Sequence, residues 1–150
     1  MSQLDTGPVE TYLHEHIPLS KAMGIAVRSA THDRVVLWAP LEPNINHRGT
    51  VFGGSAGALA ILAAWTLLHL RLTGEGHLVH LVVQRQAMSY EKPIQGCFLA
   101  TSVKPSTDAW SRFTTILRRR RRARIRTTSS LESDGQTVGR FEGEFVAVIQ

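Results

Sequence analysis

The sequence has little cysteine and no long apolar run, and each shortage argues against a class of protein. Cys97 is the single cysteine, so no disulfide forms within the chain and we expect a reducing, cytoplasmic setting. The most apolar stretch covers residues 56–68, 13 residues in all, whereas a membrane span needs about 20. The polar residues 1–8 lack the apolar segment of a signal peptide. We therefore expect a cytoplasmic protein without a membrane partner, in which Cys97 packs in the core.

Basic residues outnumber acidic ones, and the excess comes from one segment of the chain. The 150 residues carry 17 Lys and Arg against 12 Asp and Glu, a formal net charge of +5. Seven of the basic residues lie between positions 118 and 126, so the rest of the chain is slightly acidic. The excess charge is therefore a local patch that needs a local explanation. The chain is long enough for one domain, residues 1–150, and too short for two.

Hydrophobic spacing predicts the main helices and strands. Residues 9–17 have helical spacing and stop at Pro18, which predicts an N-terminal helical segment within residues 1–18. Residues 53–72 carry alanine, leucine and glycine on nearly every side, as a buried central helix does. Residues 108–117 fit either a short helix or a strand. Alternating or apolar patterns predict strands at 23–30, 34–39, 78–89, 97–103, 123–132 and 141–149.

The order of these elements predicts an α+β fold. One buried helix lies between groups of strands, and this arrangement favours an antiparallel sheet wrapped around a single long helix. The last two strands are joined by the turn at residues 133–135 and predict a hairpin. A sheet of this kind has free edges, which favour pairing with a second copy of the chain. We therefore expect a homodimer or a dimer of dimers.

Residues 46–55 carry the most informative motif. Asn46, Gly49 and the run Phe52-Gly53-Gly54 resemble the Asn-x-x-Gly-x-x-His-Gly-Gly motif of hotdog-fold thioesterases. The variant with Phe before the two glycines is most similar to the thioesterase-like domain named after the C-terminal half of the YiiD acetyltransferases. Residues 89–96 resemble the aromatic-x-x-Pro-x-x-Gly turn of these folds, and residues 140–147 resemble their last strand. The resemblance spans about residues 19–150 and implies a hotdog fold and hydrolysis of an acyl-CoA thioester.

The motif suits that chemistry because it opens a buried helix. The first N–H groups of a helix have no partner within the helix and carry partial positive charge. Glycine lets a substrate carbonyl approach such groups, so we expect Gly54, with Gly53 behind it, to stabilise an oxyanion. Asn46 is expected to orient a water molecule or the thioester oxygen. The other residues expected to bind substrate here are Thr50, Phe52, Gly53 and Ser55. The alternative is a purely structural role, in which the two glycines only permit close packing of the helix on the sheet.

The general base expected from the resemblance is absent. Many hotdog thioesterases carry Glu or Asp nine residues after the motif histidine, whose place Phe52 takes here. The ninth residue is Ile61, and residues 52–72 contain no acidic residue at all. His47 is then the nearest catalytic candidate, since its ordinary pKa suits the activation of water. Asp108 is a second candidate, from the same or a partner subunit, and a surface role for His47 stays open.

The arginine run at residues 118–122 has three interpretations. It is a solvated basic turn, a site for the phosphates of coenzyme A, or a nucleic-acid site. Arginine binds phosphate through two charge-assisted hydrogen bonds, and hotdog proteins often place basic residues at the start of this late strand. The run lacks interleaved aromatic residues, which argues against nucleic acid. The residues expected to bind coenzyme A are Arg119, Arg120, Arg121 and Arg122.

The chain is thus expected to be an acyl-CoA thioesterase. The missing carboxylate leaves open a non-catalytic acyl-CoA binding module, and the arginine run leaves open a nucleic-acid-binding protein. We expect no metal, because the seven histidines lack Cys, Asp or Glu at metal-site spacing. We expect no cofactor beyond the coenzyme A part of the substrate.

Overall fold

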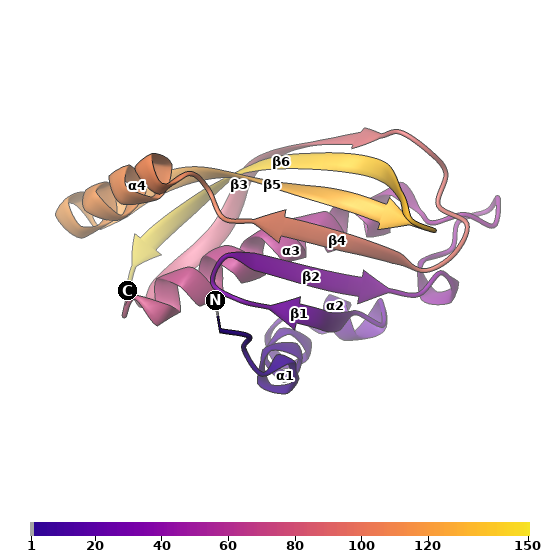
Figure 1. Cartoon of the computed structure of the whole chain (residues 1–150), viewed down its shortest axis with the longest axis horizontal. Helices are drawn as coiled ribbons and strands as arrows, with labels where there is room; N and C mark the ends of the chain where they lie inside the picture. The colour runs from indigo at the N-terminus through magenta and orange to yellow at the C-terminus, as the bar shows by residue number, and fades with distance from the viewer. Residues whose placement is uncertain (1) are drawn as a thin grey trace.

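The computed structural model describes residues 2–150 and consists of one antiparallel sheet with one long helix against it (Figure 1). The helices are α1 (Thr6–His16), α2 (Pro18–Ala22), the 3-10 helix η1 (Glu42–Asn44), α3 (Gly53–Gly74) and α4 (Thr107–Arg120). The strands are β1 (Ala26–Ala30), β2 (Arg34–Ala39), β3 (Val79–Tyr90), β4 (Phe98–Val103), β5 (Arg122–Ser133) and β6 (Gln136–Ile149). The predicted α+β fold is confirmed.

The six strands lie in the order β1-β2-β4-β5-β6-β3, and every neighbouring pair is antiparallel. The predicted hairpin is present, since Ser133 pairs with Gln136 across the turn. Along β5 the inward side chains alternate with exposed arginines and small polar residues, as the period of two predicts. The two edges of the sheet are β1 and β3.

The central helix α3 is the core of the molecule, and small side chains allow its close approach to the sheet. Ala56, Ala60 and Ala63 are buried, so the helix backbone lies near the sheet. The Ser129 hydroxyl on β5 donates to the Ala60 carbonyl oxygen at 2.9 Å. In residues 2–150, α3 is the one helix long and apolar enough to cross a membrane, but 61% of its most apolar window is buried inside the protein. This is the burial of a core helix.

The segment that the sequence left open, residues 108–117, is a helix. Ser106 caps α4, because its side chain accepts a hydrogen bond from the Ala109 N–H at 3.1 Å. Trp110, Phe113 and Leu117 are buried along one face at helical spacing. The short helix α2 was not predicted.

Cys97 corrects a sequence prediction. It was expected to pack in the core as the first residue of a strand, but β4 begins at Phe98 and Cys97 is exposed. The alternation explains the error, because the side chain preceding the buried Phe98 lies on the other face of the sheet.

The edge strand β1 is covered by the N-terminal segment. The Glu10 carboxylate accepts from the Val27 N–H at 2.8 Å, and His14 Nε2 lies 2.8 Å from the Ile25 carbonyl oxygen. The Leu4 N–H donates to the Ala30 carbonyl oxygen at 2.8 Å. These contacts occupy backbone groups along β1 and protect it from pairing with another strand.

Candidate active site at the start of the central helix

Asn46 organises the loop that leads into α3. Its side-chain oxygen accepts from the Arg48 and Thr50 N–H groups at 2.9 and 3.1 Å. Its side-chain nitrogen donates to the Thr50 hydroxyl at 2.9 Å and to the Val51 carbonyl oxygen at 3.4 Å. These four contacts use the full hydrogen-bonding capacity of the amide. Asn46 therefore positions the loop, while its predicted direct contact with water or substrate stays a prediction.

The first turn of α3 leaves two backbone donors unpaired. The N-cap residue is Phe52, which has no side-chain cap, and the Ser55 and Ala56 N–H groups donate to its carbonyl oxygen at 2.9 and 3.0 Å. Among residues 2–150, no acceptor is hydrogen-bonded to the Gly53 or Gly54 N–H. Gly54 is exposed and Gly53 is half-buried. The helix end is thus a free donor site with partial positive charge.

Two aromatic rings flank these glycines. A Cβ built on Gly54 would lie 2.3 Å from the Phe52 ring, and one built on Gly53 would lie 3.4 Å from the Tyr90 ring. The Tyr90 hydroxyl donates to the Gly53 carbonyl oxygen at 3.0 Å. Phe52 and Tyr90 are 58% and 60% exposed, so both rings are open to a ligand at the helix end. Tyr90 was not predicted as a site residue; the aromatic of its turn motif was the available signal.

The remaining motif residues lie in the same region. Thr50 is half-buried and its hydroxyl is engaged by Asn46. Ser55 is the third residue of α3 and not its N-cap. His47 is exposed in the loop between Asn46 and Arg48, and its role as a base stays a prediction.

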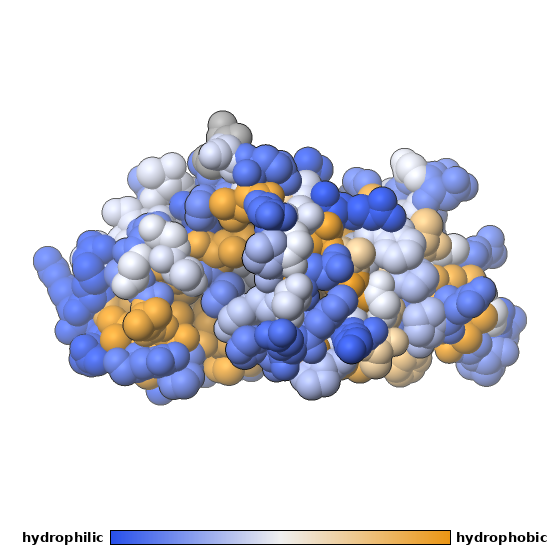
Figure 2. All heavy atoms as spheres, turned by 90° about the horizontal axis from the view of Figure 1, so that it is seen from below, coloured by the Kyte–Doolittle hydropathy of each residue, from blue (hydrophilic) through white to orange (hydrophobic). Residues whose placement is uncertain are grey.

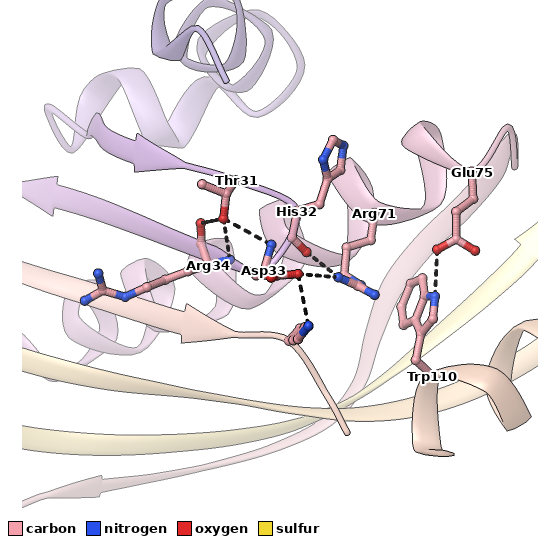
Figure 3. Close-up of polar contacts among 8 residues, drawn as sticks. Thr31, His32, Asp33, Arg34, Arg71, Glu75 and Trp110 are labelled. Atoms are coloured by element: carbon pink, nitrogen blue, oxygen red, sulfur yellow. Dashed lines mark hydrogen bonds and ion pairs between the residues drawn. The ribbon is translucent and has the colours of Figure 1, made fainter. Parts of the chain in front are cut away.

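The opposite end of α3 is fixed by a polar cluster (Figure 3). Arg71 donates to the His32 carbonyl oxygen and lies 3.3 Å from the Asp33 carboxylate. Its guanidinium carbon lies 4.5 Å from the centre of the Trp110 ring, and Trp110 Nε1 donates to the Glu75 carboxylate at 2.7 Å. The cluster holds α4 against the C-terminal end of the central helix.

The predicted arginines and Asp108 belong to this second end. Asp108 lies in the first turn of α4, and the arginines expected to bind coenzyme A occupy the end of α4 and the start of β5, where all four are exposed. A helix of 22 residues, as α3 is, is about 33 Å long at about 1.5 Å per residue. Within one chain, the arginines and Gly54 are therefore separated by roughly the length of α3 (Figure 1). The structure does not bring them together in a single copy.

The end that carries α4 is strongly hydrophilic on its surface. Figure 2 shows hydrophilic residues around this end of the molecule, at the left, with an apolar patch between them. Two arginines of β5 are paired across the sheet: Arg124 lies 3.5 Å from the Glu144 carboxylate, and Arg126 pairs with Glu142. Arg119, Arg120 and Arg122 have no carboxylate partner among residues 2–150, whereas the Arg121 guanidinium donates to the Gln150 carbonyl oxygen at 3.3 Å. Arg119, Arg120 and Arg122 therefore form the free part of the basic patch.

Solved structures share this fold. A protein of unknown function from Chlorobaculum tepidum TLS has a TM-score of 0.91 and 27% identity, covering 97% of this chain and 94% of its own. A protein described as a "putative thioesterase" from Shewanella oneidensis has a TM-score of 0.85 and 27% identity, covering 95% and 96%. A "probable thioesterase" of unknown function from Pseudomonas aeruginosa, at 16% identity, has a TM-score of 0.79 and covers 98% and 97%.

The chain has a six-stranded antiparallel sheet against one long helix, and this helix begins with two glycines. These features define a hotdog-fold protein of the thioesterase kind. The chain belongs to the family described as "Putative thioesterase (yiiD_Cterm)", whose model matches residues 7–149. The resemblance found in the sequence is thereby confirmed.

Proposed function

We propose that the chain hydrolyses acyl-CoA thioesters at the start of α3. Water attacks the carbonyl carbon, the carbonyl oxygen gains negative charge, and the C–S bond then breaks to release the acid and the thiol. The observation that supports this is the pair of free N–H groups on Gly53 and Gly54 at the helix end. A donor aimed at such an oxygen contributes about 3–4 kcal/mol to catalysis in other acyl-transfer enzymes.

The residues around the two glycines have the other roles in the proposed reaction. Gly54 donates to the oxyanion, and the loop held by Asn46 supports the approach to it. Phe52 and Tyr90 supply apolar walls on either side, while Thr50 and Ser55 line the entrance. α3 offers no carboxylate, so His47 is the candidate for the group that removes a proton from water.

The complete site requires a second copy of the chain. Because α1 occupies the β1 edge, the open edge is β3, where Val82 is 59% exposed. From Val82 to Tyr90, the backbone of β3 bonds only to β6 among residues 2–150. An exposed edge of this length favours antiparallel pairing with its own copy about a two-fold axis. Light scattering of the 16.6 kDa chain is then expected to give twice that mass.

In this pairing, the arginines at 119–122 of one copy lie at the same end of the dimer as the site of the other copy. The Tyr90 end of β3 lies at the start of α3, so β3 and α3 run in opposite directions. Two β3 strands paired about a two-fold axis place each Gly54 at the end of the dimer that carries the other copy's α4. Arg119 to Arg122 of one copy then bind coenzyme A phosphates of the substrate held by the other. The reducing cytoplasm, where coenzyme A thioesters occur, is the proposed location.

A panel of acyl-CoA substrates of different chain lengths tests the function directly. We expect release of free thiol with at least one of them, in the absence of added metal or cofactor. Calorimetric binding of acyl-CoA without thiol release would instead support a non-catalytic binding module, which the absence of an acid on α3 keeps as the second candidate. Retention on RNA or DNA that falls steeply with salt, without either result, would point to nucleic acid.

A further inference from the structure

The peptide group between Gly53 and Gly54 has a hydrogen-bond partner at one end only. Its N–H, on Gly54, has no acceptor among residues 2–150. Its carbonyl oxygen, on Gly53, accepts from the Tyr90 hydroxyl at 3.0 Å. Tyr90 lies 37 positions away in the sequence. A residue outside the motif therefore bonds to the peptide group that carries the proposed oxyanion donor.

Tyr90 is anchored on the sheet. It is the last residue of β3 and pairs with Gly139 of β6. The N–H groups of the next two residues both donate to the Val138 carbonyl oxygen, at 2.9 and 3.2 Å. The Tyr90 side chain also lies over the first turn of α3, since a Cβ built on Gly53 would be 3.4 Å from its ring and hydroxyl. The hydroxyl thus reaches the helix from a paired strand.

The bond from Tyr90 acts on the Gly54 N–H in two ways. Successive glycines allow many backbone conformations, and a bond to the Gly53 carbonyl restricts the orientation of the peptide plane that the two glycines share. A hydrogen bond to a carbonyl also polarises its peptide group, so the N–H of that group becomes a stronger donor, by roughly 10–30% per bond. A carbonyl oxygen has two lone pairs, so this bond adds to the one that the helix itself provides.

We infer that Tyr90 is a positioning residue that orients and strengthens the Gly54 N–H as the oxyanion donor. The inference rests on the proposed hydrolysis at the start of α3. The hydroxyl acts through the peptide group between the two glycines and not on the substrate. Because the substrate oxygen carries more charge in the transition state than in the bound thioester, the hydroxyl raises kcat and leaves KM nearly unchanged.

The two tyrosines of the chain provide matched variants. Tyr90→Phe keeps the ring and removes the hydroxyl, on a residue that is 60% exposed, so this variant should fold. Tyr12→Phe makes the same change on α1, where the ring packs beside Trp65, about three helical turns from Gly53. Tyr90→Phe should lower kcat about twofold to eightfold, the loss of roughly 10–30% of the donor's contribution, with KM nearly unchanged. Tyr12→Phe should change neither constant.

NMR of the peptide group tests the polarisation without any turnover. In the Tyr90→Phe chain, loss of the bond should move the Gly53 carbonyl carbon and the Gly54 amide nitrogen upfield, whereas Tyr12→Phe should leave both signals in place. Fluorotyrosine at position 90 is a stronger donor of nearly the same shape. While its phenol is protonated, both signals should move downfield and kcat should rise. A ring that acts only as a wall gives no such graded response.

Equal kcat in the wild type and the Tyr90→Phe variant would overturn the inference. Unchanged Gly53 and Gly54 signals in a folded Tyr90→Phe chain would do the same, and so would a higher KM without a lower kcat, because that result assigns Tyr90 to substrate binding alone. A wild type that releases no thiol from any acyl-CoA would refute the proposed function and the catalytic part of this inference together. The NMR signals would then still show whether the hydroxyl polarises the peptide group, so the two failures are distinguishable.

Discussion

At the scale of single residues, the loop before α3 depends on one amide group. The Asn46 side chain bonds to the Thr50 N–H and so spans the turn formed by residues 46–50. Within this turn, Gly49 has a φ of 78°. This left-handed conformation is readily adopted by glycine and is costly for other residues. The Asn and Gly of the motif therefore act together to hold the approach to the helix end.

Replacement of Asn46 by alanine is expected to lower both stability and activity. Four contacts are lost and two backbone N–H groups lose their acceptor, which costs about 1–3 kcal/mol. The free energy of unfolding, from urea titration, measures this loss. Asn46→Asp retains the accepting oxygens, so it should be less destabilising than Asn46→Ala. Equal stability of all three chains would show that the amide does not hold the loop.

His69 gives a stability that depends on pH. Burial lowers its pKa below the ordinary value, and the nearby His16 lowers it further. The unfolded chain then binds the proton more readily, so the stabilising effect is present above about pH 6.5 and is lost as the pH falls through the folded-state pKa. His69→Gln should lose less stability than the wild type between pH 7.5 and pH 5, as measured by urea unfolding. Parallel losses in the two chains would contradict this assignment.

The sequence predicted residues of the motif better than residues that act through distant contacts. Gly53 and Gly54 were correctly placed at the start of a helix, because a helix boundary is a local feature, while their role in catalysis stays a prediction. Tyr90 was missed because its contact with Gly53 joins residues 37 positions apart. Cys97 was placed wrongly because a shift of one residue at the start of a strand moves a side chain to the other face.

At the scale of elements, α1 serves as a cover for the sheet edge. Its side chains, rather than another strand, satisfy the backbone of β1. This explains why a chain with two sheet edges would associate through only one of them.

Glu10→Ala should therefore release the β1 edge. The Val27 N–H loses its acceptor, at a cost of about 1 kcal/mol, and the exposed strand becomes free to pair. We expect a lower melting temperature and association beyond the dimer in light scattering. Glu15→Ala, on an exposed residue of the same helix, is the matched control. Unchanged mass and melting temperature for Glu10→Ala would refute the covering role.

The elements themselves were largely predictable, because periodicity reports burial directly. α3 was expected at 53–72 and is observed as Gly53–Gly74. α4 stayed ambiguous because its apolar residues are few and its last turn is entirely arginine. The Ser106 cap and the packing of Trp110 on Arg71 stabilise the helical form of α4. Neither contact can be inferred from the spacing of apolar residues.

At the scale of the whole molecule, the two halves of the proposed site lie at opposite ends of α3. No property of the sequence reveals this, since it follows from the antiparallel course of α3 and β3 and from the anchoring of α4 by Trp110. In the proposed dimer, the arginines of each copy would lie at the site of the other copy.

A heterodimer of two inactive chains tests that arrangement. One chain carries Gly54→Pro together with Phe52→Ala, which removes the ring that a side chain at position 54 would meet. The other carries Arg119→Ala, Arg120→Ala and Arg122→Ala. Arg121 is retained because it ends α4 with a φ of 64°. If the arginines act in the partner's site, one of the two sites is intact, and the tagged, purified heterodimer should show about half the wild-type kcat per dimer. Arginines that act within their own chain would leave the heterodimer as inactive as either homodimer.

Stabilisation of the oxyanion by the Gly54 N–H can be tested by a comparison of two variants at position 54. Phe52→Ala first removes the ring that a side chain at position 54 would meet. In that background, Gly54→Ala keeps the N–H, whereas Gly54→Pro removes it at a first-turn position where proline is tolerated. We expect a kcat about 100- to 1000-fold lower for the proline variant than for the alanine variant, at similar melting temperatures. Equal kcat values in two folded variants would contradict it.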